Sequence, residues 1–321
     1  MIKVSVIVLC YNGEKFIPRC FESLRNQTLD NFEVIIVNDG SEDDSLNIIN
    51  SRITDLGDGR KSKVINFTTN HGQAYCRIKG IEAASGEYVI ACDIDDYIDS
   101  KMLETLYAKA KCEDIDIVSC DFYRVIGNKK IIDVQPISNS PIENIKLILL
   151  AKKWGGVWNH LIKRSLLDGV KPPESNIMED TNILIQCLLK AKNCSHISCP
   201  LYYYVIRNNS TTSSTVSFQT LYEQAVYMNI NVLAIESFVK EKGLTELNDF
   251  IEYRKFFNKR WINPIIKSAK DCKFWISINS EINCKFLLNP HISFRDKIIS
   301  ILIIIRIYPL LKGIYENYLH T

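Results

Sequence analysis

The sequence lacks the signatures of two common classes of nucleotide-binding protein. No Gly-x-Gly-x-x-Gly motif follows its first strand-like stretch, which argues against a dinucleotide-binding Rossmann domain, and no Gly-x-x-x-x-Gly-Lys-Ser/Thr motif occurs, so there is no P-loop. Its 11 cysteines include no Cys-x-x-Cys pair, which argues against a structural zinc site. The net charge of +2 creates no global field that points to nucleic acid as a partner.

Long apolar runs are also scarce. The run at the N-terminus is short, alternates valine with serine, and leads into the polar Tyr11-Asn12-Gly13, so we interpret it as a first strand rather than a signal peptide. Most cysteines fall inside apolar stretches, where free cysteine behaves as a small buried hydrophobe. Reduced thiols in a cytoplasmic protein are the simplest interpretation.

The chain has 321 residues, of which 46% are hydrophobic and 24% are charged, a composition typical of a globular protein. The first third alternates strand and helix patterns, which predicts an α/β fold with a mostly parallel sheet and helices on both faces. The expected strands are residues 4–9, 33–37, 63–67 and 88–92, with helices at 16–25, near 43–53 and at 74–84.

A cluster of carboxylates follows the last of these strands. The apolar residues 88–92 lead directly into Asp93, Asp95 and Asp96. Carboxylates this close repel one another, so the cluster needs a cation or hydrogen-bond donors. Oxygen ligands suit Mg²⁺ or Mn²⁺, and Mg²⁺ is often held by one or two carboxylates together with substrate phosphates. The alternative is a solvated acidic turn that caps the helix starting near Ser100.

Polar residues follow other strands in the same way. Asp39 and Asn70 each come after a strand, as Asp93 does. The carboxyl ends of parallel strands lie along one edge of a sheet, where ligands bind in open α/β folds, so we expect the three side chains to converge on one crevice. With no P-loop present, phosphates bound there would be neutralised by a metal and by Arg or Lys.

The middle third offers further candidate site residues. Glu179 and Asp180 open an amphipathic helix, although acidic residues at a helix start are also favoured by its dipole. Trp158 lies in an aromatic loop and could stack on an acceptor sugar or be buried. Residues 202–207 are rich in tyrosine and strand-like, and Arg207 at their end could approach a diphosphate or simply be exposed there.

From residue 218 the chain has helical patterns. Residues 298–311 are strongly apolar but include Arg306 and Pro309, and they are too few and too interrupted to span a bilayer. Basic and tyrosine residues flank this stretch, which favours a helix lying at a membrane interface. A helix packed in the core explains the same pattern equally well.

Taken in order, these motifs resemble glycosyltransferase family 2 over residues 4–207. The motifs are Val4–Val8 with Tyr11 and Asn12, Val37–Ser41, Gly72–Ala74 with Arg77, Ala84–Tyr88, Asp93–Asp96, and Glu179 with Asp180. The departures are small: Cys92 stands where leucine is common, and Cys76 and Lys79 replace the usual residues beside Arg77. No catalytic position of the family pattern is lost.

The resemblance implies a GT-A fold with a Rossmann-like sheet flanked by helices. The C-terminal third lies outside the resemblance, and its helical patterns predict a helical C-terminal region. Residues 1–217 would form the catalytic domain, with a nucleotide-sugar-binding part at 1–125 and an acceptor part at 126–217, and residues 218–321 the helical region. The implied reaction is an inverting transfer from a nucleotide diphosphate sugar, with a UDP-sugar expected, to a hydroxyl of a glycan or lipid-linked acceptor. The donor would be of the hexosyl or N-acetylhexosaminyl class. Bacterial surface-polysaccharide assembly is the implied setting. Independently of the resemblance, the apolar stretch with its basic and tyrosine flanks predicts that residues 295–321 contact the cytoplasmic face of the membrane.

The resemblance also implies roles for individual residues. Asp39 would bind the base, Asp93 the ribose and Asp95 a Mg²⁺ or Mn²⁺ ion. Tyr11, Asn12 and Arg77 would lie near the nucleotide. A base is also needed on the face opposite the leaving group. Asp180 meets that need with Glu179 beside it, and we expect the helix start to keep Asp180 ionised.

Two other functions use similar features. One is a nucleotide-sugar-binding protein without transferase activity, which the full set of acidic residues argues against. The other is a nucleotidyltransferase, which would be expected to carry a Gly-rich, Arg-containing loop after the first strand. Residues 10–18 do not supply such a loop.

Overall fold

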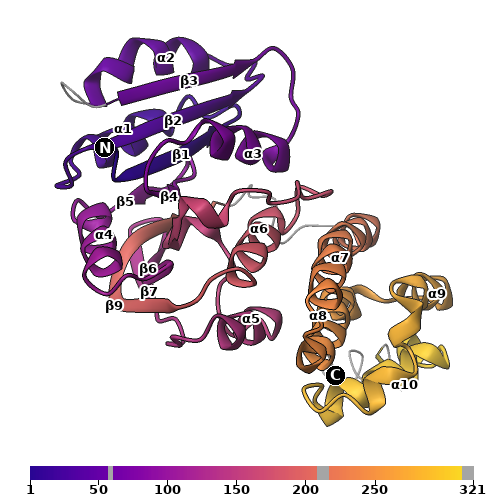
Figure 1. Cartoon of the computed structure of the whole chain (residues 1–321). Coiled ribbons are helices and arrows are strands. Elements are labelled where there is room, and N and C mark those ends of the chain that lie inside the picture. The colour runs from indigo at the N-terminus through magenta and orange to yellow at the C-terminus, as the bar shows by residue number, and fades with distance from the viewer. Residues whose placement is uncertain (57–60, 208–216, 313–321) are drawn as a thin grey trace. The chain divides into compact units, whose positions relative to one another are not determined.

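The computed structural model describes residues 1–56, 61–207 and 217–312. This part of the chain divides into two compact units. The first takes in residues 1–148 and 152–207, and the second takes in residues 217–312 together with 149–151. Figure 1 colours them from indigo through magenta for the first unit, and orange to yellow for the second.

The first unit alternates strands with helices, which confirms the predicted α/β class (Figure 1). Its strands are β1 (Val4–Cys10), β2 (Phe32–Asp39), β3 (Lys61–Phe67), β4 (Tyr88–Ala91), β5 (Tyr97–Ile98), β6 (Ile117–Ile126), β7 (Lys129–Asp133), β8 (His160–Lys163) and β9 (Cys194–Val205). Its α-helices are α1 (Ile17–Arg25), α2 (Ser45–Arg52), α3 (Gln73–Ala83), α4 (Met102–Cys112), α5 (Pro141–Leu149) and α6 (Glu179–Leu188).

All the strands belong to one sheet in the order β3-β2-β1-β4-β8-β6-β9-β5, with β7 paired to β6. The pairings among β3, β2, β1 and β4 are parallel, as the alternating pattern predicts. Beyond β4 the sheet is mixed, because β8 runs antiparallel to both β4 and β6 while β6 and β9 are parallel. The parallel half therefore brings the carboxyl ends of β1, β2 and β4 to one edge.

The inner strands of the parallel half are buried on both faces, whereas the edge strand β3 is exposed or half-buried along its length. Every residue of β1 and β2 is inaccessible to solvent or nearly so, as expected for parallel strands covered by helices. Helix α3 lies against β1 and β2. The approach is so close that a Cβ on Gly80 would lie 2.4 Å from Cγ2 of Ile7. Glycine at this position lets the helix pack directly on the first strand.

The strand that closes the other half is longer than its sequence indicates. The tyrosine-rich run predicts a strand at 202–207, whereas β9 begins at Cys194. Its register against β6 shifts at Asp121, which pairs with Pro200. A proline that cannot donate a ladder hydrogen bond explains both the irregularity and the weak pattern before residue 201.

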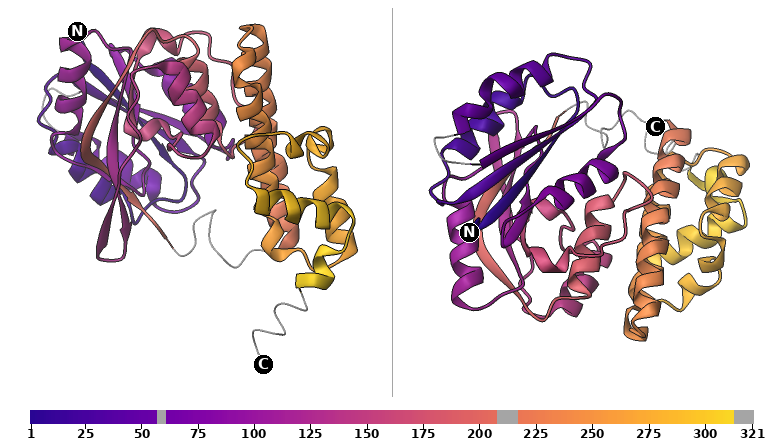
Figure 2. Two further views of the ribbon diagram at one scale, coloured as in Figure 1. Left: turned by 90° about the horizontal axis from the view of Figure 1, so that it is seen from below. Right: turned by 45° about the horizontal axis from the view of Figure 1, so that its top comes forward.

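The second unit is helical, as predicted. Its α-helices are α7 (Phe218–Glu241), α8 (Asn248–Arg260), α9 (Ala269–Ser277) and α10 (Phe294–Ile304). Helices α7 and α8 pack side by side (Figure 2). Its core includes Phe256, Trp275 and Ile303. Lys259 is buried among them, where its ammonium donates to the carbonyl of Ile278 and lies 3.9 Å from the ring centre of Trp275.

The apolar stretch predicted at residues 298–311 is not one helix. α10 ends at Ile304, and Arg306 adopts a positive φ of 64° before Pro309. Helical structure resumes at residues 308–312. Within the described ranges, no helix combines the length and apolar character needed to cross a bilayer. Residues 313–321 lie outside the described part of the chain.

Candidate active site

The candidate site is built on loops that follow β2, β3 and β4. Asp39 closes β2, and its buried carboxylate accepts backbone N–H groups from His71 and Gly72 at 2.7 and 2.9 Å. It also accepts the Asn70 amide at 3.0 Å. The carboxylate of Asp39 therefore fastens the loop after β3 to the end of β2. Of the three side chains predicted to converge, those of Asp39 and Asn70 are in contact, while the convergence of Asp93 with them stays a prediction.

Glycine is required at two points of this junction. Gly40 and Gly72 have φ of +66° and +89°, in the region that side chains with a Cβ rarely adopt. A Cβ on Gly40 would also lie 2.4 Å from the backbone of Thr69, and one on Gly72 would lie 2.4 Å from the amide of Asn176. These positions let the loops approach each other closely around Asp39.

Tyr11 and Asn12 lie in the loop after β1. Asn12 has a positive φ of 47°, its backbone N–H donates to Ser41 Oγ at 3.0 Å, and its side-chain oxygen accepts from the N–H of Glu42 at 2.9 Å. Asn12 thus links the loops after β1 and β2, while the ring of Tyr11 is exposed beside it. Tyr11 is therefore available to contact a ligand, and Asn12 holds the loop.

The acidic stretch after β4 divides into three environments. Asp96 is buried and accepts hydrogen bonds from the Tyr202 hydroxyl and the N–H of Val205, both at 2.7 Å. Asp96 therefore ties the loop to β9 and is not exposed to a ligand. Asp93 and Asp95 retain partial exposure, with side chains 25% and 21% accessible. These two carboxylates are the ones available to a ligand.

Asp95 lies among positive groups. Its carboxylate pairs with Arg207 at the end of β9, and its carbonyl accepts from Arg19 Nη2 at 2.5 Å. Burial, followed by the charge of Asp93, raises the pKa of Asp95 above its usual range, and Arg207 acts in the opposite direction. The guanidinium of Arg207 also lies 4.7 Å from the ring centre of Phe16. The sequence left Arg207 open between a diphosphate contact and simple exposure, and it indicated neither the ion pair of Arg207 with Asp95 nor the contact of Arg19.

Arg77 connects the acidic loop to the helix pair. It is buried on α3, its Nε donates to Glu179 Oε1 at 3.0 Å, and its Nη2 lies 3.4 Å from Asp93 Oδ1. Although burial opposes protonation, Glu179 and then Asp93 raise the pKa of Arg77 above its ordinary value. Arg77 thus bridges two carboxylates that are 86 positions apart in sequence, which its charge and position alone did not reveal.

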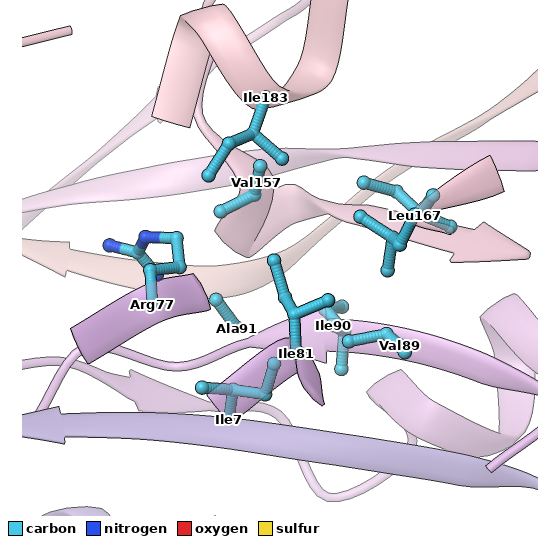
Figure 3. Close-up of a pocket in the computed structure, with 10 residues that line it drawn as sticks. Ile7, Arg77, Ile81, Val89, Ile90, Ala91, Val157, Leu167 and Ile183 are labelled. Atoms are coloured by element: carbon cyan, nitrogen blue, oxygen red, sulfur yellow. The ribbon is translucent and has the colours of Figure 1, made fainter. Parts of the chain in front are cut away.

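A small apolar cavity lies behind Arg77 (Figure 3). Arg77 is at one end of it, and the other nine lining residues are apolar, among them Ile7, Ile81 and Ile183. Such a lining does not suit a nucleotide. It places a low-dielectric medium behind the guanidinium, which strengthens its attraction to Glu179 and Asp93.

Asp180 follows Glu179 in the first turn of α6. The helix is preceded by Met178, a non-glycine residue with φ of +66°, which turns the chain sharply before the acidic pair. Asp180 is partly exposed, and its Oδ1 accepts the N–H of Thr181 at 2.7 Å. Burial and then the neighbouring charge of Glu179 raise its pKa to about 8, with Arg77 acting in the opposite direction.

This raised pKa corrects the expectation that the helix start keeps Asp180 ionised. Removal from water and repulsion by Glu179 outweigh the favourable helix dipole, which is a small effect confined to the first turn. A carboxylate with a pKa near the working pH is well matched to general base catalysis.

Trp158 is the inner member of an aromatic cluster. It is only 3% exposed, and its ring stacks on Tyr202 and Tyr204 with centroid distances of 4.4 and 5.6 Å. Trp154 is the exposed tryptophan of the same loop. The sequence pattern did not distinguish the two, since both flank the glycine pair at 155–156.

The carboxylates of the acidic loop suit a divalent ion that is bound mainly through the phosphates of the substrate. Within the described ranges, no three Asp, Glu, His or Cys side chains gather as a closed metal site. Asp93 and Asp95 are partly exposed and mutually repulsive, and Mg²⁺ characteristically takes only one or two carboxylates alongside phosphates and water.

Comparison with known proteins places these features in context. The model of the family "Glycosyl transferase family 2" matches residues 5–185. EpsH from Bacillus subtilis (strain 168) is 35% identical over 217 residues, which cover 64% of this chain and 62% of EpsH. The match thus spans less than two thirds of that relative. A cholesterol galactosyltransferase from Borreliella burgdorferi is 32% identical over 272 residues, covering 79% of this chain and 72% of that protein.

Solved structures share the fold. The crystal structure of residues 1–349 of S. aureus TarS in complex with UDP-GlcNAc has a TM-score of 0.59 at 21% identity, covering 86% of this chain and 87% of that chain. The mannosyltransferase PcManGT from Pyrobaculum calidifontis, in complex with GDP-Man and Mn²⁺, has a TM-score of 0.56 at 13% identity and covers 98% of this chain and 87% of that one. The mixed sheet with flanking helices is therefore a fold that the chain shares with these two proteins.

Proposed function

The chain belongs to glycosyltransferase family 2, and from this premise we propose that it transfers a sugar from a nucleotide diphosphate donor to an acceptor hydroxyl, with inversion at the anomeric carbon. The observation that carries the proposal is the buried bridge through Arg77, which joins Asp93 in the acidic loop to Glu179 beside Asp180. The bridge holds Asp93, which is suited to bind the donor, and Glu179, the neighbour of the proposed base, at fixed positions in one site.

The donor is proposed to be a UDP-sugar of the hexosyl or N-acetylhexosaminyl class. Support comes from the exposed Tyr11 and from the loop junction around Asp39, at the sheet edge where nucleotides bind in α/β folds. Asp93 is partly exposed on the same edge, which suits contact with the ribose. Arg77 is buried, so we assign it to holding Asp93 and Glu179 rather than to direct contact with the nucleotide.

Asp95 is proposed to bind Mg²⁺ or Mn²⁺ together with the donor diphosphate. Such an ion, when bound, stabilises the negative charge that develops on the leaving diphosphate. Arg207 forms an ion pair with Asp95, and we propose that its guanidinium contacts a phosphate oxygen of the donor. The Mn²⁺ complex of PcManGT supports the ion as a proposal for this chain.

Asp180 is proposed as the catalytic base. Its Oδ1 is engaged by Thr181, which leaves Oδ2 to take the proton of the attacking hydroxyl. Glu179 is held by Arg77 through two contacts of 3.0 Å, so it cannot turn away from Asp180. Glu179 thereby fixes the position of the base and raises its pKa.

The first unit is proposed to bind both the donor and the acceptor. Residues 1–217 would form the catalytic domain, with donor binding in 1–125 and acceptor binding in 126–217, while residues 218–321 form the helical region. The site residues Asp39, Arg77 and Asp93 lie in the first part, and Glu179 and Asp180 lie in the second. The linking residues 208–216 are outside the described part of the chain.

The C-terminal region is proposed to contact the cytoplasmic membrane face. Helix α10 buries Ile303 in the core of its unit, while Phe294, Ile298 and Ile301 are exposed at a spacing that puts them on one helix face, with Ile305 just beyond. Arg295 is exposed beside them. An apolar face with adjacent positive charge suits an interface of anionic lipids. A glycan or lipid-linked acceptor of surface-polysaccharide assembly would be presented there.

A donor panel with and without Mn²⁺ tests the proposed reaction. We expect slow, metal-dependent release of nucleoside diphosphate from one nucleotide sugar in the absence of acceptor. A binding protein without transferase activity would release nothing, and a nucleotidyltransferase would produce pyrophosphate. Either result would replace the proposed function.

A further inference from the structure

The loop before β8 exposes one aromatic ring among buried neighbours. Lys153 and every residue from Gly156 to His160 are buried, whereas Trp154 is 41% exposed. An exposed tryptophan in a buried loop loses the stabilisation that full burial would give it, so its position at the surface calls for a different explanation.

Three contacts hold Trp154 in place. Its backbone N–H donates to the buried Gln135 Oε1 at 2.8 Å, and on one side the ammonium of Lys153 donates to Asn144 Oδ1 at 2.7 Å. On the other side Gly155 is packed so tightly that a Cβ there would lie 2.7 Å from Thr181 Oγ1. The indole is therefore presented by a fixed backbone, which limits the conformational entropy lost when a ligand binds.

Tyr204 of β9 extends the exposed ring surface. Its ring centre lies 5.8 Å from that of Trp154, and its ring is partly exposed. Trp158 supports Tyr204 from below in a stacked arrangement at 5.6 Å, and Phe122 packs edge-on against Trp154 at 5.7 Å. Trp154 and Tyr204 are thus the outer layer of a packed aromatic cluster.

The loop that carries Trp154 packs against the helix that carries the proposed base. A Cβ on Gly155 would lie 2.7 Å from Oγ1 of Thr181, the residue that follows Asp180. Burial, and after it the charges of Asp96, Asp95, Asp93 and Asp180, raise the pKa of Tyr204 to about 12, so Asp180 is among the charges that act on its hydroxyl. The sheet order puts β9 on the opposite side of β4 from β2, where Asp39 marks the proposed nucleotide end.

We propose that Trp154 and Tyr204 form a stacking platform for a sugar ring of the acceptor, in the site whose transferase function is proposed above. The C–H groups on one face of a pyranose carry partial positive charge and match the negative face of an aromatic ring. A sugar stacked there keeps its hydroxyl edge free to turn toward Asp180. A linear polyol or a phosphate has no flat apolar face to present, so the platform selects a cyclic sugar.

Saturation-transfer difference NMR tests the platform with defined probes. Methyl glucoside, methyl galactoside and methyl N-acetylglucosaminide are added separately to the full chain loaded with UDP and Mg²⁺, with sorbitol as the linear polyol. We expect enhancement of the C–H protons on one face of at least one pyranoside and none for sorbitol. Equal enhancement for sorbitol, or none for any pyranoside, overturns the platform.

Variants assign the signal to the rings. Trp154→Leu keeps apolar volume but no aromatic face, and we expect it to weaken pyranoside binding roughly three- to tenfold, the scale of an aromatic contact. Trp154→Phe should retain most of the binding, and Tyr204→Leu should resemble Trp154→Leu. Trp261→Leu removes an exposed tryptophan of the second unit and should change nothing.

Two further measurements keep the outcomes separate. Calorimetry of UDP binding to each variant shows whether its donor site is folded. A pyranoside signal that survives Trp154→Leu overturns the platform while leaving the transferase proposal standing. Failure of the wild-type chain to release diphosphate from any donor overturns the proposed function, whatever the pyranosides show.

Discussion

The proposed base gives the sharpest prediction for a single side chain. Asp180→Asn keeps the shape of the residue and removes its basicity, so we expect sugar transfer to fall by about 10²–10⁴. Donor affinity should stay nearly unchanged, because the Asp39 and Asp93 loops are untouched. Transfer rates and donor calorimetry on the same preparations check this. A near wild-type transfer rate would mean that the base lies elsewhere and that the Glu-Asp pair only starts a helix.

The pH dependence should report the same carboxylate. Because the pKa of Asp180 is raised to about 8, its basic form appears as the pH rises, so kcat/KM should increase with pH and level off above that value. Glu179→Gln removes a negative charge that raises this pKa, so the rising limb should move to lower pH. Its loss of transfer rate should be smaller than that of Asp180→Asn. A limb that stays fixed in Glu179→Gln would contradict the assignment.

The two exposed carboxylates of the acidic loop should respond differently to substitution. Activity should require Mg²⁺ or Mn²⁺, and Asp95→Ala should abolish the metal dependence of donor binding. Asp93→Ala should chiefly weaken nucleotide affinity. Donor titrations with and without the ion separate the two effects, and full activity in excess chelator would remove the metal from the proposal.

At the residue scale, the sequence identified the acidic groups but not their partners. Asp39, Asp93 and Asp95 are visible because each follows an apolar strand. The bridge from Arg77 to Glu179 depends on how α3 and α6 pack, and no local pattern encodes that. Whether Trp154 or Trp158 is the exposed ring depends on the path of their loop. Local propensity does not determine that path, because the loop contains a pair of glycines.

Among the structural elements, the junction between the acidic loop and β9 depends on Asp96. The Tyr202 hydroxyl donates to Asp96 and also accepts the N–H of Asp93 at 3.2 Å. If asparagine replaced Asp96, an amide nitrogen facing this hydroxyl would have no acceptor. We expect Asp96→Asn to lower the free energy of unfolding by about 1–3 kcal/mol. Urea denaturation measures this change.

Asp30→Asn is a suitable control for this substitution. Asp30 is exposed before β2, so the same change of charge should have little effect there. Equal stability of the Asp96→Asn and Asp30→Asn variants would show that Asp96 does not hold the loop to the strand.

The parallel half of the sheet followed from the sequence because its inner strands β1, β2 and β4 are buried and largely apolar. The remaining half was harder to predict. Strand β9 begins eight residues before the predicted start at Tyr202, since Pro200 and the bulge opposite Asp121 interrupt the alternation. Strand β5 has only two residues, too few for any periodicity.

At the scale of the whole molecule, the exposed face of α10 predicts lipid binding. The chain should sediment with vesicles that contain anionic phosphatidylglycerol and much less with neutral ones. Ile298→Asp combined with Ile301→Asp should abolish this binding while donor hydrolysis continues. Leu233→Asp, at an exposed position of α7, is the matched control. Equal binding by the double variant would exclude this face as the contact.

The sequence predicted a helical C-terminal region but left its apolar stretch open between a core helix and an interfacial one. The structure shows that α10 buries Ile303 and exposes Ile298 and Ile301, so one face packs in the core while the membrane contact of the other face stays a prediction. A stretch that is apolar on all sides contains no periodic signal from which its two faces could be told apart.

The raised pKa of Asp180 also affects the protonation state of the enzyme between turnovers. Burial and the charge of Glu179 favour the neutral acid, so Asp180 is protonated at neutral pH more often than an exposed aspartate would be. A protonated carboxyl cannot accept the proton of a water molecule, so we expect hydrolysis of the bound donor to be slow at neutral pH and to become faster as the pH rises.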